Sequence, residues 1–335
     1  MSRAGRLLLI LVALVTLSAN WLSPNPPEAQ FLDRAYAPPT PIHVRDADGF
    51  RTPFIYPQQV EDPVARTYSE DRRRPQTLRW FRDGRLVSVD AGAGPLFLLG
   101  ADPLGRDVWA RLLAGARLSL GVALLGLLGA LVIGGAAGGV AGTFGGRTDA
   151  VLMHVADFLV VLPAAYVVLV LRGLVSGAPS TADVFWLMAG FFALAGWPTV
   201  ARGVRAVVAA ERSREYAEAA RAAGAGPWRL VRTLLPAARG FLSTQAVLLL
   251  PALLLAEVTV SFVGLGFTEP AVSWGTMLET LANVRLLGEA PWLIAPALAV
   301  FIVVLGLQLA AGARGPASVL HLRDRPRGIR RVAGV

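Results

Sequence analysis

The chain has 335 residues, of which 54% are hydrophobic and only 16% are charged, with a formal net charge of +9 and a mean hydropathy of +0.54. So few charges exclude a disordered or collagen-like chain and fit poorly with a water-soluble globule. Cysteine is absent and the three histidines lie far apart, so we expect no disulfide, no metal site and no cofactor. The apolar residues gather into long runs, which predicts a protein that crosses a membrane several times.

The first apolar run, Leu7 to Leu22, follows two arginines and stops before Pro24. Its length is close to the roughly 20 residues that span the hydrocarbon core. A signal-peptide cleavage site after Ala19 would need a small residue two positions earlier, where the chain has Leu17. We therefore expect residues 1–23 to form an uncleaved signal-anchor transmembrane helix.

Residues 24–105 are rich in proline and aromatic residues, and their positive and negative charges balance. The segments 41–44, 53–56 and 86–89 are bounded by proline, glycine and aspartate, a pattern typical of short strands. We predict a small extracytoplasmic insert here that contains β-strands.

Five further apolar runs follow, at Leu118 to Ala141, Val151 to Leu171, Val184 to Val200, Phe241 to Ala256 and Trp292 to Ala311. Each can cross the membrane as a helix, because a helix satisfies its own backbone hydrogen bonds inside lipid. The prediction is an all-α polytopic membrane protein with six transmembrane helices. Its core membrane domain spans residues 106–312, and a basic tail spans residues 313–335.

Arginine placement in the short loops predicts the orientation of these spans. With the N-terminus inside, the cytoplasmic segments are the residues before Leu7, residues 143–150, 201–239 and 312–335, and all of them carry arginine. The short outer loops, residues 173–183 and 257–291, hold only Arg285. Since positive loops stay in the cytoplasm, we expect both termini there.

The stretch from Gly100 to Ser119 precedes the second predicted span. Asp102 to Gly105 favours a turn, and the charged residues that follow, Arg106, Asp107, Arg111 and Arg117, suggest an interfacial helix that anchors the span at the membrane surface. Glycines in the span itself have the spacing that lets helices approach closely in lipid. We expect them to serve packing, within the chain or against a partner.

The cytoplasmic segment 211–236 is predicted to hold two short helices. Ser213 is a suitable N-cap, Gly224 can end the first helix in the left-handed conformation, and Pro227 suits the first position of the second helix. The first helix is rich in alanine, so it can seat closely in a groove of another protein. An equally weighted interpretation is that it lies on the membrane surface or packs against its own bundle.

The spacing of Glu218-Ala219-Ala220, Gly224 and Leu234-Leu235-Pro236 resembles the EAA loop of permease subunits of binding-protein-dependent ABC importers. In that family the loop forms a coupling helix that sits in a cleft of a cytoplasmic ATPase. The interval from glycine to proline is one residue shorter here than in the family pattern. The resemblance implies the type I importer permease fold. The coupling residues that it implies are Glu215, Glu218, Ala219, Ala220, Arg221, Gly224 and Pro236.

Two further stretches are similar to the C-type subunit of the peptide and nickel branch of this family. One is Gly100 to Ser119, and the other is Ser261 to Gly266 with Ser273-Trp274-Gly275 and Ala290 to Leu293. Together the matches cover about Gly100 to Ala311.

The resemblance implies an inner-membrane permease subunit that translocates oligopeptides or dipeptides and is not itself an enzyme. The implied partners are a second permease subunit in a heterodimer, two cytoplasmic ABC ATPase subunits and an extracytoplasmic solute-binding protein, with no role for nucleic acid. A phosphate-binding P-loop is excluded in this chain because it has no lysine.

Asp157 and Glu257 are acids at membrane depth, where a charge is costly enough to indicate function or pairing. For Asp157 we favour structural pairing, with Arg147 or an arginine of the coupling segment. Glu257 stays open between a place on the substrate route and an interfacial acid.

The sequence fits two other classes of protein less well. An ion-coupled secondary transporter would need paired ionisable groups and broken helices at mid-membrane, of which the sequence shows little. A membrane enzyme with its active site on residues 23–106 would need a nucleophile, a base and an orienting group, and no such spacing is recognisable there.

Overall fold

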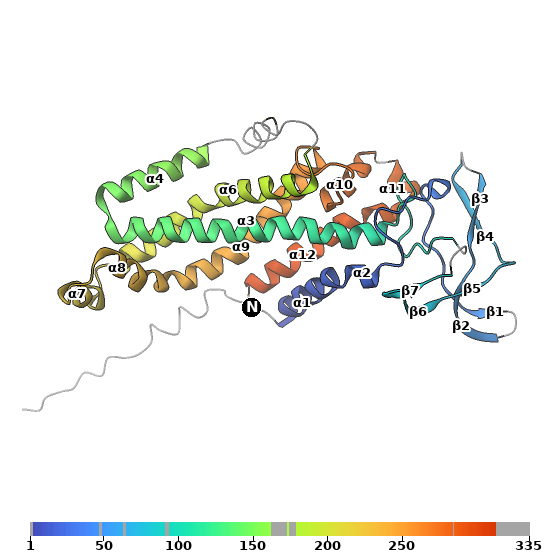
Figure 1. Ribbon diagram of the computed structural model, residues 1–335, viewed down its shortest axis with the longest axis horizontal. Helices are drawn as coiled ribbons and strands as arrows, with labels where there is room; N and C mark the ends of the chain where they lie inside the picture. Colours follow the sequence, from blue (N-terminus) through green and yellow to red (C-terminus); the bar gives the residue numbers. More distant parts are fainter. Residues whose placement is uncertain are drawn as a thin grey trace, which may run out of the picture.

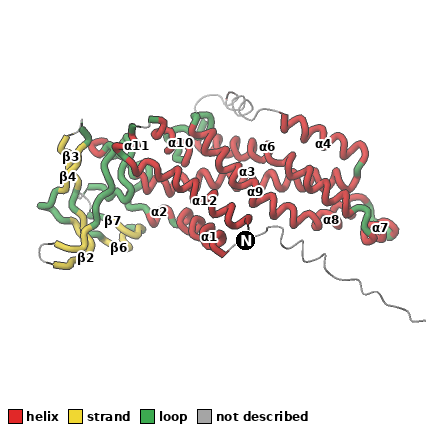
Figure 2. Tube along the Cα trace, turned by 180° about the vertical axis from the view of Figure 1, so that it is seen from behind, coloured by secondary structure: helices red, strands yellow, loops and turns green. Residues whose placement is uncertain are grey.

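The computed structural model describes residues 3–46, 49–62, 65–90, 94–161, 179–283 and 285–312, together with Gly173. The described chain is an elongated helical bundle with a group of short strands at one end and helix α7 at the opposite end (Figure 1). Figure 2 shows the same separation from behind, with the strands gathered beyond the helix ends.

The helices are α1 (Arg3–Leu17), α2 (Ala19–Leu22), α3 (Val108–Phe144), α4 (Gly146–Val161), α6 (Thr181–Glu211), α7 (Glu215–Ala222), α8 (Pro227–Leu234), α9 (Arg239–Phe262), α10 (Trp274–Glu279), α11 (Leu286–Glu289) and α12 (Ala295–Gly312). Short 3-10 turns lie at Leu32–Arg34, Leu235–Ala238, Thr280–Ala282 and Pro291–Ile294.

Within the described residues, four helical segments are long and apolar enough to cross a membrane: Val108–Phe144, Thr181–Glu211, Pro227–Phe262 and Pro291–Ala310. The first three each contain one of the predicted spans, and the fourth covers all but the last residue of the span predicted at Trp292 to Ala311. The first predicted span appears as a shorter apolar helix, Leu7–Leu17. Of the predicted span at Val151 to Leu171, only the part inside α4 is described, and residues 162–171 lie outside the described residues, as does the tail from residue 313.

The helix that contains the second predicted span begins ten residues before that span, since α3 runs without a break from Val108. Asp107 caps it, its side chain accepting a hydrogen bond from the backbone N–H of Trp109. Of the charged residues predicted to lie on an interfacial helix, Arg111 and Arg117 thus lie in the first turns of α3, and Arg106 and Asp107 lie just before it. Without a proline after the cap, the backbone has no reason to leave the helix.

The bundle core forms where α3 packs along α6. A β-carbon on Gly134 would lie only 2.6 Å from the β-carbon of Val200, and one on Gly126 would lie 2.6 Å from the β-carbon of Phe192. Glycine is required at such positions because any side chain would push the helices apart. These glycines serve packing within the chain, the first of the two roles expected for them.

The strands are β1 (His43–Asp46), β2 (Gly49–Ile55), β3 (Gln58–Asp62), β4 (Thr67–Glu70), β5 (Gln76–Thr77), β6 (Arg79–Arg82) and β7 (Arg85–Ser88). They form an antiparallel sheet in the order β1-β2-β5 and two hairpins, β3–β4 and β6–β7. The segments 41–44, 53–56 and 86–89 each overlap a strand. Phe54, Ile55 and Leu96 are fully buried, so this part of the chain has its own small core.

Side-chain hydrogen bonds connect the strand region and α1 to the bundle. The indole N–H of Trp292 donates to the Ala101 carbonyl at 2.9 Å, and Arg117 donates to the Thr16 carbonyl at 2.9 Å. The start of α1 and the end of α12 also lie together, since the backbone of Ala310 fills the space that a β-carbon on Gly5 would need. These contacts place both ends of the described chain on the same side of the bundle.

Candidate functional site

Helix α7 begins directly after the long helix α6. Its N-cap is Arg214, whose backbone is extended (φ −80°, ψ 150°) and which makes no side-chain capping bond. Ser213, the N-cap expected from sequence, instead donates to the Ala210 carbonyl at 3.1 Å. The cap is shifted because the hydroxyl completes the last turn of α6 rather than opening α7, a local competition typical of serine.

Helix α7 ends as its glycine predicts. Gly224 has φ +78°, in the left-handed region. Its N–H donates to the Arg221 carbonyl at 2.9 Å, and the N–H of Ala225 donates to the Ala220 carbonyl at 3.0 Å. This pair of bonds is the Schellman arrangement, which satisfies carbonyls that a helix end leaves free. The end of α7 is therefore a defined structure and not a frayed turn.

The surface of α7 is divided between one buried residue and an exposed remainder. Ala217 is fully buried and packs with Val204 and Val208 of α6 and with Leu234 of α8. The residues of the predicted coupling set lie mostly outside this contact: Glu215, Glu218, Ala219, Arg221, Gly224 and Pro236 are exposed, and Ala220 is half-buried. Only one side of the helix is thus held by the bundle, and the other side is free to contact a partner.

Helix α8 attaches α7 to the span that follows. Gly226 is its N-cap and Pro227 stands in its first turn, as expected. Val231 and Leu234 are buried against the bundle. Two polar contacts also link α7 to the end of α6: the Tyr216 hydroxyl donates to Glu211 at 2.9 Å, and the Arg221 guanidinium donates to the Arg212 carbonyl. A displacement of α7 would therefore be passed to both flanking spans.

The α7 surface, defined here as the exposed residues of α7 together with Gly224, also borders a polar pocket of about 440 Å³, lined by Ala141, Gly142, Gly145, Asp149, Ala209, Arg212, Ser213, Glu218 and Arg221. Beside it, Trp228 is 65% exposed and its ring packs edge-on against Phe144 at 5.6 Å. The sequence analysis did not single out Trp228 as an exposed residue next to α7. Its position directly after the Gly226-Pro227 helix start and before Arg229 could have indicated that it is exposed.

Asp157 lies 2.6 Å from the guanidinium of Arg202 in α6, and both side chains are substantially exposed. The sequence predicts Arg147 or an arginine of segment 211–236 as the partner of Asp157, and that prediction is wrong. The two groups meet because α4 packs beside α6, a neighbourhood that the order of residues does not reveal.

Glu257 lies in α9 and is fully buried where α9 meets α3 and α10. The Ser261 hydroxyl donates to its Oε1 at 2.9 Å, and the hydroxyls of Ser119 and Ser273 face the same carboxyl. Among the described residues, Oε2 has no well-formed hydrogen bond. This burial supports a position inside the protein rather than at the lipid interface.

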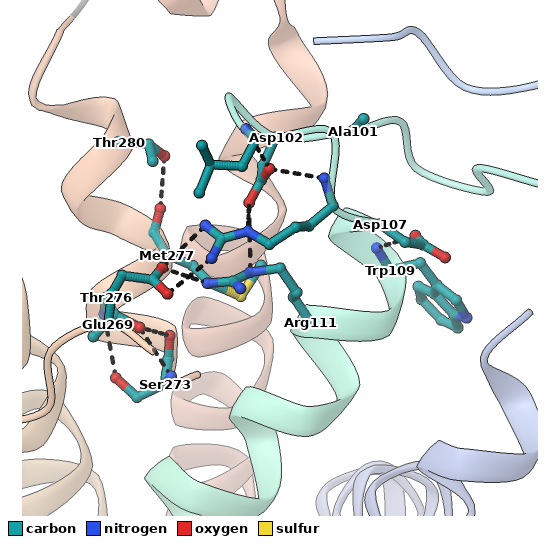
Figure 3. Close-up of polar contacts among 12 residues, drawn as sticks. Ala101, Asp102, Asp107, Trp109, Arg111, Glu269, Ser273, Thr276, Met277 and Thr280 are labelled. Atoms are coloured by element: carbon teal, nitrogen blue, oxygen red, sulfur yellow. Dashed lines mark hydrogen bonds and ion pairs between the residues drawn. The ribbon is translucent and has the colours of Figure 1, made fainter. Parts of the chain in front are cut away.

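A separate cluster of charged side chains consists of Asp102, Arg106, Arg111 and Glu269. Figure 3 shows how Asp102, Arg111 and Glu269 face one another. The guanidinium of Arg106 contacts Asp102 at 2.6 Å and both oxygens of Glu269 at 2.8 and 3.1 Å. Arg111 donates to Glu269 at 2.6 Å. Both arginines are buried, so each needs the paired carboxylates to compensate for lost hydration. The cluster fixes the segment before α10 against the start of α3.

The geometry corrects the predicted role of this stretch. Arg106 and Arg111 are not exposed along a membrane surface, and Arg117 donates to α1 instead. The sequence interpretation missed Glu269, which lies about 160 positions further along the chain. A surplus of arginines at the start of α3 was the signal that a distant acid had to be present.

Asp107 is fully buried beside this cluster. It accepts hydrogen bonds from the Asn25 amide and from the Trp109 backbone, both at 2.9 Å. Burial nevertheless dominates, and it raises the pKa of Asp107 to about 6, against the smaller lowering effect of these bonds.

The described residues contain no group of three or more His, Asp or Glu side chains that could hold a metal ion. The described fold and the α7 surface define a polytopic membrane protein with a helix presented at one end.

Comparison with known proteins identifies the family. The model of the binding-protein-dependent transport system inner membrane component matches residues 130–313. The chain belongs to this family, and it is a membrane-integral transport protein rather than an enzyme.

Relatives carry consistent names. The chain is 35% identical over 226 residues to the dipeptide transport system permease protein DppC of Bacillus subtilis, a match that covers 67% of this chain and 62% of that protein. It is 36% identical over 230 residues to the nickel transport system permease protein NikC of Escherichia coli, covering 68% and 79%. It is 29% identical over 208 residues to the oligopeptide transport system permease protein OppC of Lactococcus lactis, covering 62% and 69%.

Proposed function

We propose that this chain is the permease subunit of an ATP-driven ABC importer, and that its α7 surface docks on a cytoplasmic ATPase subunit. The observation that carries the proposal is the form of α7, an eight-residue helix held by Ala217 on one side, closed by Gly224, and exposed over Glu215, Glu218 and Ala219. Small side chains on the exposed side permit close docking, and the acids and Arg221 supply polar contacts at its edge.

The chain's own residues would convert docking into movement of the spans. Closure of the ATPase subunits around ATP would displace α7. Because Ala217 packs against α6 and Leu234, and because α8 leads into α9, the displacement would move two spans together. ATP shifts the equilibrium between inward-open and outward-open states only by its differential affinity for them.

We further propose six spans with both termini in the cytoplasm. Residues 1–23 would form the signal anchor, 24–105 the extracytoplasmic insert, 106–312 the core permease domain with its coupling loop at about 211–236, and 313–335 the basic tail. The contact between Gly5 of α1 and Ala310 of α12 supports termini on one side. The position of the strands and α7 at opposite ends supports an outer insert and an inner coupling surface (Figure 1).

The proposed partners are a second permease subunit, two ATPase subunits and an extracytoplasmic solute-binding protein, in the inner membrane. The printed names of the relatives support a dipeptide or oligopeptide as the solute, and nickel as a further candidate. Asp157 and Glu257 have structural roles in this proposal, since each is placed by neighbours within the chain.

The proposal is tested by solute uptake into vesicles that contain the assembled complex. We expect dipeptide uptake that requires the binding protein outside and ATP inside, and that persists when proton and sodium gradients are collapsed. Uptake driven by an ion gradient without ATP would contradict it and would favour a secondary transporter.

A further inference from the structure

The β6–β7 hairpin (Arg79–Ser88) exposes two large aromatic side chains. Every residue of β6 is exposed, with Trp80 at 51% and Phe81 at 72%. In the same region Phe54 and Phe97 are completely buried. Adjacent exposed aromatic residues are costly in water, so they indicate a surface that contacts something else.

The hairpin lies beside α2 and the first turns of α3. The ring of Phe81 is 5.9 Å from the ring of Trp21 in α2, and the Arg85 guanidinium donates to the Pro24 carbonyl. The hairpin turn also lines a pocket of about 450 Å³ together with Ala110 and Ala114 of α3. Ala114 lies four residues, or about 6 Å along the helix, before Leu118, where the predicted span begins, so the turn lies close to the expected membrane level.

An apolar stripe on the first helix leads to the same place. Ile10, Leu14, Leu17 and Trp21 are 55%, 57%, 76% and 41% exposed. Their spacing of three or four residues puts them along one side of α1 and α2, which is the side that lipid would cover. Phe81 extends this stripe beyond the helix end through its contact with Trp21.

Arginines flank the two aromatic residues. The side chains of Arg79 and Arg82 are 49% and 50% exposed, and both contact Asp90, at 2.7 and 3.4 Å. Arg82 also lies 3.7 Å from Asp83. Among the described residues these contacts leave part of each guanidinium's five donors unused, and the planar geometry of the group suits a phosphate. Aromatic rings next to arginines are the combination found at the level of lipid headgroups.

We propose that the β6–β7 hairpin rests in the outer headgroup layer of the membrane, with Trp80 and Phe81 among the upper acyl chains and Arg79 and Arg82 on lipid phosphates. The hairpin thereby holds the insert against the bilayer. This inference rests on the membrane placement in the proposed function.

The absence of cysteine allows a direct test, because a single introduced cysteine is the only site that a thiol-specific spin label can modify. Three full-length variants are compared in vesicles of phosphatidylethanolamine and phosphatidylglycerol: Phe81→Cys in the hairpin, Leu14→Cys on the lipid-facing stripe, and Phe50→Cys in β2, where the side chain is 87% exposed. Collision rates with oxygen, which concentrates in lipid, and with a water-soluble nickel complex are measured for each label.

We expect the oxygen-to-nickel ratio at position 81 to be several-fold above that at position 50 and below that at position 14. A ratio at 81 equal to that at 50, with 14 in lipid, would overturn the inference and leave the proposed function intact. Shielding of position 81 from both reagents would mean that protein covers the hairpin, and it would also overturn the inference. An aqueous reading at position 14 would instead contradict the membrane placement itself.

Discussion

At the scale of single residues, the buried acids show how environment sets the role of a carboxyl group. Glu257 is fully buried and receives a hydroxyl bond from Ser261, whereas Asp107 is fully buried and caps α3. Asp107 lies at the N-terminal end of α3, outside the predicted span at Leu118 to Ala141. Its protonation state therefore affects the stability of the folded protein as an ordinary buried acid would. This coupling gives a pH-dependent prediction.

Because the pKa of folded Asp107 is raised to about 6, above its ordinary value of 3.8, the folded state binds the proton more tightly than the unfolded state. The contribution of Asp107 to stability is therefore greatest at low pH and falls as pH rises from about 4 to about 6, by roughly 3 kcal/mol. We expect Asp107→Asn, which keeps a capping oxygen, to remove this decrease. Thermal unfolding in detergent between pH 4 and pH 7 measures it.

The matched control is Asp33→Asn, which removes an exposed acid, with 69% of its side chain accessible. That variant should retain the wild-type slope of thermal stability against pH. An unchanged slope in Asp107→Asn would contradict the assignment.

Gly224 carries the second prediction at this scale. A β-branched side chain at φ +78° is strained by roughly 1–2 kcal/mol, so Gly224→Val should disrupt the end of α7. We expect ATP-driven uptake to fall at least about tenfold, with membrane insertion unchanged. Gly226→Val is the control, because Gly226 has extended backbone (φ −66°, ψ 162°) and open space around it. Full uptake by Gly224→Val would reject the role of the glycine.

At the scale of elements, the proposed function gives the two sides of α7 different roles. Its buried side, Ala217, attaches it to α6 and α8, and its exposed side is available to a partner. This separation predicts that the same substitution will affect stability at position 217 and partner binding at position 219.

Ala217→Leu should lower the stability by about 1–3 kcal/mol, because the larger side chain overpacks a fully buried position. Ala219→Leu should change stability by less than about 0.5 kcal/mol, because the position is exposed. The exposed substitution should nevertheless weaken co-purification with the ATPase subunit. Thermal midpoints and pull-down yields of the two variants separate these effects, and wild-type ATPase binding by Ala219→Leu would count against docking through this face.

At the scale of the whole molecule, the close approach of α3 and α6 organises the bundle. Where the glycines of α3 face α6, the backbones approach too closely for any side chain, and the apolar residues of α9, α10 and α12 complete the core. Packing of this kind contributes strongly in lipid, where no hydrophobic driving force brings helices together.

Neighbouring glycines in α3 provide a sharp test of this packing. A β-carbon on Gly134 would meet Val200 at 2.6 Å and the Trp197 carbonyl at 2.7 Å, whereas a β-carbon on Gly135 would meet nothing within 4 Å. We expect Gly134→Ala to destabilise the bundle by on the order of 1–3 kcal/mol and Gly135→Ala to be neutral. Thermal unfolding in detergent checks both, and equal midpoints would contradict the arrangement.

The sequence by itself determined the properties that depend on local chemistry. Long apolar runs predicted the positions of four helices that can cross a membrane, since hydropathy is a property of neighbouring residues. Gly224 ends α7 and Pro227 starts α8 as predicted, because backbone conformation at glycine and proline is intrinsic to those residues. The motif around Glu218 is also a local pattern of residues, and the family that it predicted is the one that matches residues 130–313.

Only the tertiary structure decided which groups meet. It gave Arg106 and Arg111 a common partner in Glu269, it gave Asp157 the partner Arg202, and it placed Phe81 against Trp21. A buried charge needs a partner of opposite sign, and the sequence states that need. Which residue meets it depends on how helices pack across the bundle, because electrostatic and packing energies fall with distance in space and not with separation along the chain.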